Sequence, residues 1–257
     1  MYRDSHALAA LLASTAALFI SAACNRPNTA SNVAAPGEPK STQTAALEVG
    51  AALLQNREPL KLLDMYLDGF HFMSGAMSEQ MEAHHYCGKL NEELIQCVIF
   101  DGNQKDAKLM GVEYIVSERL FKTLPADERP LWHSHRYEVK SGALIAPGLP
   151  EAAEHALMKQ LVSTYGKTWH TWHTHRKEAL PLGLPQPMMG FTKDGQMRPE
   201  LRSERDRRFD LSTEKERARR ADLPEPPIAE GADAWQEDPG KAVRLQRAPA
   251  DRAPAQK

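Results

Sequence analysis

The fold is decided by the stretch Leu94-Ile-Gln-Cys-Val-Ile-Phe-Asp-Gly-Asn103 in the middle of the chain. Its first seven residues are almost all apolar and rich in β-branched side chains, which predicts a strand buried on both faces. The Asp-Gly-Asn end is a turn signal. From Leu109 to Val116 apolar residues then alternate, with Glu113 on the opposite face. We therefore expect an antiparallel pair of strands here.

Helical patterns lie on both sides of this pair. Residues 45–54 and 60–69 carry apolar side chains at helical spacing, and each predicts a helix. Residues 150–165 predict the clearest helix of the chain, and residues 167–175 predict a further strand. The expected fold class is α+β, an antiparallel sheet with a few packed helices, flanked by a disordered N-terminal tether and a disordered C-terminal tail.

Composition bounds the function classes. The chain has 257 residues, 42% of them hydrophobic, and a net charge of -2. This is enough apolar material for one core, and the charge argues against nucleic acid as a partner, since phosphate binding needs a basic surface. Three cysteines are too few for a disulfide scaffold. Cys87 and Cys97 either pair across a hairpin in an oxidising compartment or are small buried hydrophobic residues.

The N-terminus resembles a bacterial export signal. Residues 1–23 contain Arg3, then an apolar run too short to span a membrane, then small residues. Ser21-Ala-Ala-Cys24 resembles a lipobox, in which the cysteine becomes the lipidated N-terminus. We expect a lipoprotein on the outer membrane, facing the periplasm and bound to the membrane through this lipid. The alternative is a soluble periplasmic or secreted protein.

Three further segments follow the signal. Residues 24–44 contain almost no large apolar side chain and are expected to form a flexible tether. Residues 45–191 form the expected folded domain. Residues 192–257 are dense in charges of both signs, which predicts a solvated, disordered tail.

Two histidine-rich runs fall within the expected sheet. They are Glu82-Ala-His-His-Tyr-Cys87 and Trp132-His-Ser-His-Arg-Tyr-Glu138. If the second run is extended, His133 and His135 point to one face and Glu138 to the other. Two such imidazoles can chelate a divalent metal with a third ligand from a neighbouring strand. His84 or His85 would supply it, and because they are consecutive only one of them shares that face.

The sequence thus gives two sets of candidate site residues. The candidate metal ligands are His84, His85, His133 and His135, and the further binding candidates are Glu113, Glu138 and His170. The alternative is that these histidines are hydrogen-bonded sheet residues or line an apolar pocket. Nothing marks Cys87 as an activated thiolate, so no catalytic residue is assigned. The sequence favours a binding protein over an enzyme.

Several motifs together resemble the oil-body-associated protein family. They include Gly69-Phe-His-Phe72, Met81-Glu-Ala-His-His-Tyr-Cys87, Leu131-Trp-His-Ser-His135, Tyr137-Glu-Val-Lys-Ser-Gly142, Tyr165-Gly-Lys-Thr-Trp-His170 and Leu180-Pro-Leu-Gly183. The resemblance runs from about residue 60 to residue 191. It implies association with lipid surfaces, as plant members have with seed oil bodies, and it implies no reaction, cofactor or catalytic residue.

Two functions are therefore expected from different classes. The first is a lipid-anchored envelope protein that binds a lipid surface, an apolar ligand or a partner. The second is a metal-binding protein or metal-dependent enzyme that uses the histidine cluster, with a divalent metal as its cofactor.

Overall fold

The computed structural model describes residues 28–247, so the expected signal at residues 1–23 and the expected lipid attachment at Cys24 lie outside the described residues. The strands are β1 (Met65–Met73), β2 (Ala76–Asn91), β3 (Leu94–Phe100), β4 (Leu109–Ser117), β5 (His133–Ser134), β6 (Thr164–His170) and β7 (Gln186–Met189). The helices are α2 (Thr42–Leu54), α3 (Glu58–Lys61), α4 (Glu118–Phe121), α5 (Arg136–Ser141), α6 (Glu151–Leu161), α7 (Pro199–Phe209) and α8 (Thr213–Arg219). Short 3₁₀ turns are η2 (Arg129–Leu131), η3 (Thr174–Arg176), η4 (Ala234–Gln236) and η5 (Pro239–Lys241). No helix within residues 28–247 is long and apolar enough to cross a membrane.

The strands form one antiparallel sheet that closes on itself. Its order is β4-β3-β2-β1-β7-β6-β5, and β4 also pairs with β6. That pairing runs from Gly111 opposite His170 to Ser117 opposite Thr164. The other edge of β6 is shared by β5 and β7. Alternate side chains of the closed sheet therefore point inward, and the predicted α+β fold with an antiparallel sheet is confirmed.

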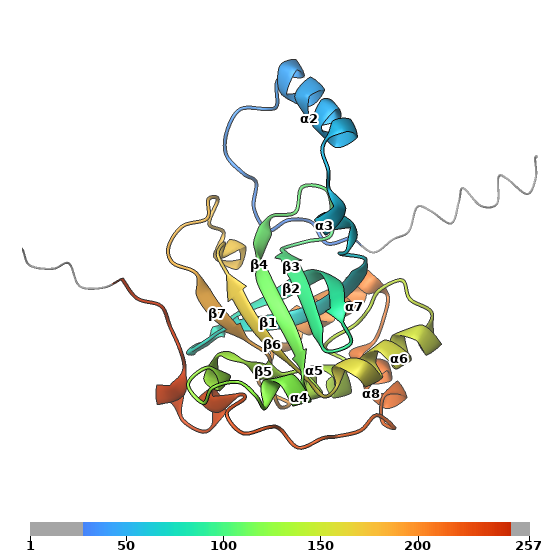
Figure 1. The fold of residues 1–257 in the computed structure, drawn as a ribbon, viewed down its shortest axis with the longest axis vertical. Coiled ribbons are helices and arrows are strands. Elements are labelled where there is room, and N and C mark those ends of the chain that lie inside the picture. Colours follow the sequence, from blue (N-terminus) through green and yellow to red (C-terminus); the bar gives the residue numbers. More distant parts are fainter. Residues whose placement is uncertain (1–27, 248–257) are drawn as a thin grey trace, which may run out of the picture.

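The two ends of the closed sheet are filled differently. At one end, inward residues of β1 to β4 pack against α5 and α6 through Val139, Met158 and Leu161. At the other end Met73, Met81 and Met188 pack together. In Figure 1 the helices α4, α5, α6 and α8 lie together below the strands. The interior between these two ends is consequently shielded from solvent.

A disulfide joins Cys87 on β2 to Cys97 on β3. The two residues are directly opposite in the antiparallel register, with their Cα atoms 4.0 Å apart. Of the two alternatives for these cysteines, pairing across the hairpin is the one the structure has.

Two helix predictions need correction. Residues 60–69 were predicted to be helical, but α3 ends at Lys61 and β1 begins at Met65. From Leu67 onward β1 is buried on both faces, so its apolar residues form an unbroken run with no visible alternation. The predicted helix 150–165 ends at Leu161, and β6 starts at Thr164.

The predicted disordered tail is also corrected, because α7 packs against β2 and α8 packs against α5. Two of its arginines, Arg205 and Arg220, are fully buried. Arg220 donates to the carbonyl oxygens of Val139 and Leu144, at 2.7 and 2.8 Å, and pairs with Glu154. A dense charge pattern predicts solvation, whereas here buried carbonyl groups and carboxylates compensate the guanidinium groups.

The N-terminal segment divides at α2. Residues before it contact the turn after β3, where Ser31 donates to Asp101 (2.8 Å) and the Thr29 amide donates to Asn103 (2.8 Å). α2 itself has no buried residue, and it stands away from the body of the protein in Figure 1.

Candidate metal centre

Seven titratable side chains meet inside the closed sheet, and we call them the inner cluster. All are at most 4% exposed. They are His71, His85, Glu113, His133, His135, Glu138 and His170. Five imidazoles and two carboxyl groups therefore share one enclosed space.

Strand register explains why the cluster forms. His85 lies opposite Leu67 and Ile99, which are both inward residues. Glu113 is opposite Cys97 and Thr168, so it also points inward. The alternation in β4 had predicted that Glu113 lies on the face opposite the apolar side chains. In the structure Glu113 is on the buried face, and the side chains of Val112 and Tyr114 on the other face are exposed.

A change of backbone conformation brings Glu138 into the cluster. Only His133 and Ser134 are extended, and α5 begins at Arg136. The helical turn rotates Glu138 back toward the two histidines, whereas an extended run would have pointed it away. The predicted opposition of Glu138 to His133 and His135 is therefore wrong, and the three side chains converge.

The carboxylate of Glu113 is central to the cluster. Its Oε2 lies 3.1 Å from His85 Nε2. Its Oε1 lies 3.4 Å from Nε2 of both His133 and His135. One carboxylate thus faces three imidazole nitrogens.

Two overlapping sets of side chains have metal-ligand spacing. In the set His71, Glu113 and His133, and in the set His133, His135 and Glu138, the ligand atoms lie within 4.8 Å of one another. Glu138 Oε2 is 3.9 Å from His133 Nε2. His133 belongs to both sets, so it is the residue on which any ion in the cluster would depend most.

The tautomer of His135 suits metal binding. Thr164 Oγ1 donates its proton to the Leu161 carbonyl at 2.7 Å. The same oxygen lies 2.8 Å from His135 Nδ1, so it must accept from that nitrogen. With the proton on Nδ1, the lone pair of Nε2 points at Glu113 and Glu138. Fixing the tautomer through the second ring nitrogen is the arrangement seen around metal-bound histidines.

Buried nitrogen atoms without partners show that the cluster fits a metal. Within residues 28–247, both ring nitrogens of His85 and of His133, and Nδ1 of His170, have no partner in hydrogen-bonding geometry. Buried polar atoms are costly when unpaired. A cation among these nitrogens would compensate them, and imidazole with carboxylate is a donor set for zinc, iron, copper or nickel.

Two glycines make room for these side chains. A Cβ on Gly166 would lie 2.1 Å from Glu113 Oε1 and 2.8 Å from His135 Nε2. A Cβ on Gly190 would lie 2.9 Å from Glu138 Cδ and from His133 Cδ2. Because no other residue fits without displacing the cluster, both glycines belong to the site.

The protonation states favour a cation-binding cluster. Burial raises the pKa of Glu113, but the adjacent imidazoles outweigh it and hold that pKa well below its usual value. Burial lowers the pKa of His71 and His170, and repulsion from His85 lowers both further. Burial raises the pKa of Glu138 to about 8. Burial thus favours the neutral form of His71 and His170, the form in which imidazole binds metal, whereas the neighbouring carboxyl groups of Glu113, Glu138 and Asp233 outweigh burial and raise the pKa of His133.

The predicted ligands are divided by the sheet. His85, His133, His135, Glu113, Glu138 and His170 come together in the inner cluster. His84 does not, because it is on the outer face of β2, opposite Asp68. Sequence reasoning missed His71, since the first part of its strand, up to Gly69, had been predicted to be helical and the strand was not recognised. The alternation of Gly69, His71 and Met73 would have marked an inward face if that segment had been taken as extended.

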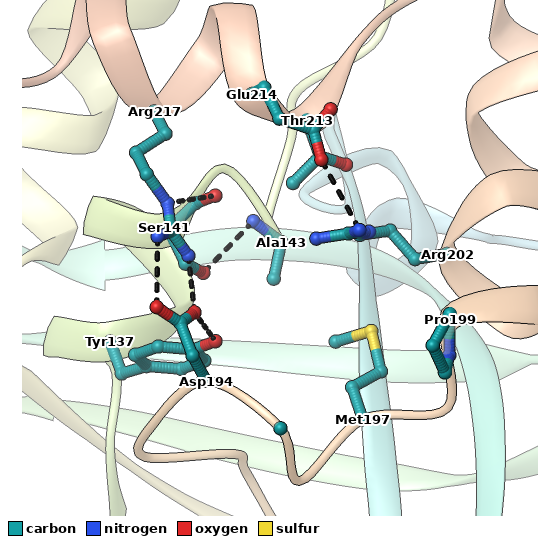
Figure 2. Close-up of a pocket in the computed structure, with 11 residues that line it drawn as sticks. Tyr137, Ser141, Ala143, Asp194, Met197, Pro199, Arg202, Thr213, Glu214 and Arg217 are labelled. Atoms are coloured by element: carbon teal, nitrogen blue, oxygen red, sulfur yellow. Dashed lines mark hydrogen bonds and ion pairs between the residues drawn. The ribbon is translucent and has the colours of Figure 1, made fainter.

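The room around the inner cluster is small. A cavity of about 10 Å³ lies beside His71, His85 and Glu113, roughly the space of one water molecule. A larger surface pocket of about 250 Å³ lies next to α5 and α8. Figure 2 shows Asp194 there, between Tyr137 and Arg217 and bonded to both. Since the residues lining it include no histidine or cysteine, the surface pocket is the weaker candidate.

Comparison with known proteins gives consistent matches. A family model described as "Protein of unknown function (DUF1264)" matches residues 57–224. Oil body-associated protein 1A of Zea mays is 48% identical over 190 residues, which is 74% of this chain and 80% of the relative. Oil body-associated protein 1B of Arabidopsis thaliana is 41% identical over 234 residues, which is 89% of this chain and 94% of the relative. No solved structure matches the chain.

Proposed function

The chain belongs to the oil body-associated protein family, and from this premise we propose that it is a metal-binding protein that works at a lipid surface. The ion would be a divalent transition metal resident in the inner cluster. The observation that carries the proposal is the convergence of His71, Glu113 and His133 with His135 and Glu138 at ligand spacing, in full burial. Buried nitrogen atoms without partners support it.

Each residue of the inner cluster would have a different role in binding the ion. His133 would be the shared ligand, and Glu113 or Glu138 would supply the negative charge that balances the metal. Thr164 would orient His135 through Nδ1. A bound divalent ion supplies Lewis acidity. The enclosed surroundings leave space for about one water-sized ligand, so the centre suits stabilisation of the fold or chemistry on a very small molecule.

Elemental analysis tests this proposal. The chain from Asn25 to Lys257 is made without a histidine tag, and its metal content is measured beside that of the His133→Ala variant. We expect close to one transition-metal ion per chain, and its loss in the variant. His155→Ala is the matched control, since His155 lies on α6 at the surface and pairs with Asp222. Folded wild-type protein that takes up no metal after dialysis against zinc, iron, copper or nickel would refute the proposal.

A second observation favours attachment to a lipid surface. On α2, Leu53 and Leu54 are 79% and 87% exposed, and Leu47 is 67% exposed. Leu60 and Leu62 after it are also exposed. Exposed leucines on a helix that buries none of its residues in the described chain offer an apolar surface on which a lipid can bind. The position of α2 just after the expected tether fits a lipid anchored at Cys24, and an outer-membrane location facing the periplasm belongs to this same proposal.

Vesicle binding tests the second proposal. Wild-type chain from Asn25 is floated with phosphatidylglycerol–phosphatidylethanolamine vesicles beside a Leu53→Glu/Leu54→Glu variant. We expect the wild type to float and the variant to stay in solution. The control is Leu180→Glu/Leu182→Glu, which changes two leucines of similar chemistry, 50% and 58% exposed, in a loop remote in sequence from α2. Equal flotation of all three proteins would refute a role for α2.

A further inference from the structure

A second group of side chains with ligand chemistry lies on the outer face of the sheet, and we call Asp68, Glu82 and His84 the outer cluster. Asp68 on β1 is directly opposite His84 on β2, and Glu82 is two residues before His84 on the same face. Asp68 and His84 are fully buried, and the Glu82 side chain is 10% exposed. Helix α7 covers them with Arg205 and Arg208.

Each carboxylate of the outer cluster accepts a hydrogen bond from an arginine with one oxygen, and its other oxygen has no hydrogen-bond partner in the part of the chain that the structure describes. Asp68 Oδ1 accepts from Arg205 at 3.2 Å, while Oδ2 has no hydrogen-bond partner among the described residues. Glu82 Oε2 accepts from Arg208, while Oε1 has no such partner within residues 28–247. The two arginines therefore fix both carboxylates and leave the second oxygen of each facing His84.

The imidazole of His84 lies between these two oxygens. Its Nδ1 is 3.1 Å from Asp68 Oδ2, and its Nε2 is 3.5 Å from Glu82 Oε1. Nδ1 already has a partner, Tyr66 Oη, at 2.8 Å. Nε2 has no hydrogen-bond partner in the described part of the chain. One ligand atom from each of the three residues lies within 4.8 Å of the others.

We propose that the outer cluster is a second divalent-cation site, with Asp68 Oδ2, Glu82 Oε1 and His84 Nε2 as its protein ligands. Three buried atoms that have no hydrogen-bond partner among the described residues lie close together there, and a cation would compensate all three. The donor set is two oxygens and one nitrogen, so it suits a harder ion such as Mn²⁺ better than the nitrogen-rich inner cluster does. Arg205 and Arg208 act as positioning residues, because each holds a carboxylate so that its second oxygen faces His84.

The outer site has a route from solvent. Tyr66, which touches His84, also lines a surface groove of about 870 Å³ together with Tyr86, Asn103 and Phe209. Arg208, at the edge of the cluster, keeps 29% of its side chain exposed. An ion can therefore exchange here without opening the closed sheet, and the site does not depend on the inner cluster being occupied.

Mn²⁺ binding to variants tests the proposal. The full chain from Asn25 is stripped of metal and titrated with Mn²⁺ while the EPR signal of unbound Mn²⁺ is followed. Wild type and His133→Ala are expected to bind one equivalent at the outer site. Glu82→Gln and His84→Gln are expected to weaken that binding at least about tenfold. The matched control is Glu154→Gln, which alters another carboxylate held by a buried arginine, Arg220. Mn²⁺ binding by Glu82→Gln and His84→Gln equal to that of wild type would overturn the proposal.

Nitrogen couplings measured on the folded His133→Ala protein keep the proposal testable if those variants do not fold. Pulsed EPR of bound Mn²⁺ should show coupling to a single imidazole, that of His84. Coupling to two or more imidazoles, or no bound Mn²⁺ at all, would overturn the second site. Loss of transition metal from His133→Ala with Mn²⁺ binding retained separates the two sites, since only the inner one depends on His133.

Discussion

His84 and His85 are adjacent in sequence but belong to two different environments. His85 points into the closed sheet, where its Nε2 lies 3.1 Å from Glu113 Oε2 and its ring meets the imidazole of His71 edge-on. His84 points outward to Asp68 and Glu82, and both of those carboxylates are held by arginines of α7. Inside, nitrogen donors outnumber carboxylates and no arginine or lysine pairs with the cluster residues among the described contacts. The period of two in a strand thus produces two chemically distinct clusters from one short sequence.

The outer and inner clusters are also stabilised by different interactions. The outer cluster depends on ion pairs with α7, which is far away in sequence. Replacing an arginine of α7 with an uncharged residue should therefore disrupt the outer cluster. The inner cluster depends on the space that Gly166 and Gly190 leave and on the tautomer of His135. A larger residue at either glycine, or removal of a bound metal, should therefore destabilise it. Each difference can be measured.

The largest expected effect is on the outer face. Arg205→Met removes the donor to Asp68 Oδ1 and to the Ala143 and Gly142 carbonyls. Because this removes the guanidinium partner of a buried carboxylate, we expect the free energy of unfolding to fall by about 3–5 kcal/mol. Urea unfolding followed by circular dichroism measures it. Arg202→Met on the same helix is the control, since its side chain is 37% exposed. Equal losses in the two variants would contradict the buried role of Arg205.

The second effect concerns the inner face. With a free metal concentration one hundred times the dissociation constant, bound metal should add about 2.7 kcal/mol to the free energy of unfolding. A chelator should remove this contribution from wild type, whereas in His133→Ala it can remove only an ion bound at the outer cluster, so its effect on that variant should be smaller. Thermal unfolding with and without the chelator measures the difference. The inner centre would be refuted by a chelator effect of the same size in both proteins.

The third effect concerns space on the inner face. Gly166→Ala places a methyl group 2.1 Å from Glu113 Oε1, which should cost about 1–3 kcal/mol through displaced side chains. It should also lower the transition-metal content while Mn²⁺ binding at the outer cluster persists. Gly50→Ala on α2 is the control, because a Cβ there meets nothing within 4 Å. Unaltered metal content in Gly166→Ala would show that this glycine serves only the backbone.

Much of this architecture was predictable from local patterns. The strand at 94–100 follows from its apolar, β-branched run, although it is buried on one face and partly exposed on the other instead of buried on both. The strand at 109–116 follows from alternation, and the convergence of His133 with His135 follows from their spacing. The burial of Arg205 could not be predicted from the sequence, because a segment dense in charges is expected to be solvated. Arg205 is buried because it binds Asp68 and the Ala143 carbonyl, which are far away in sequence. The side on which Glu138 lies did not follow either, because it depends on α5 starting one residue after His135.

The smallest effect is expected for an exposed ion pair, which serves as the comparison for the buried ion pairs of the outer cluster. Asp194 pairs with Arg217 in the surface pocket, and hydrogen bonds from Arg217 and Tyr137 lower its pKa to about 2. Because the pKa of Asp194 is depressed in the folded state, its ionised form stabilises that state at pH values above the unfolded pKa of about 3.9. This contribution is lost as the pH falls from about 4 to about 2.

The Asp194 side chain is 69% exposed, so solvent and salt screen the pair. Asp194→Asn should therefore cost only about 0.2–1 kcal/mol at neutral pH and low salt, and its difference from wild type should vanish at about pH 2 or in molar salt. Urea unfolding of both proteins across that pH range measures it. A loss as large as that of Arg205→Met would mean that burial does not distinguish the arginine–carboxylate pairs of this protein, and the contrast between its faces would then need another cause.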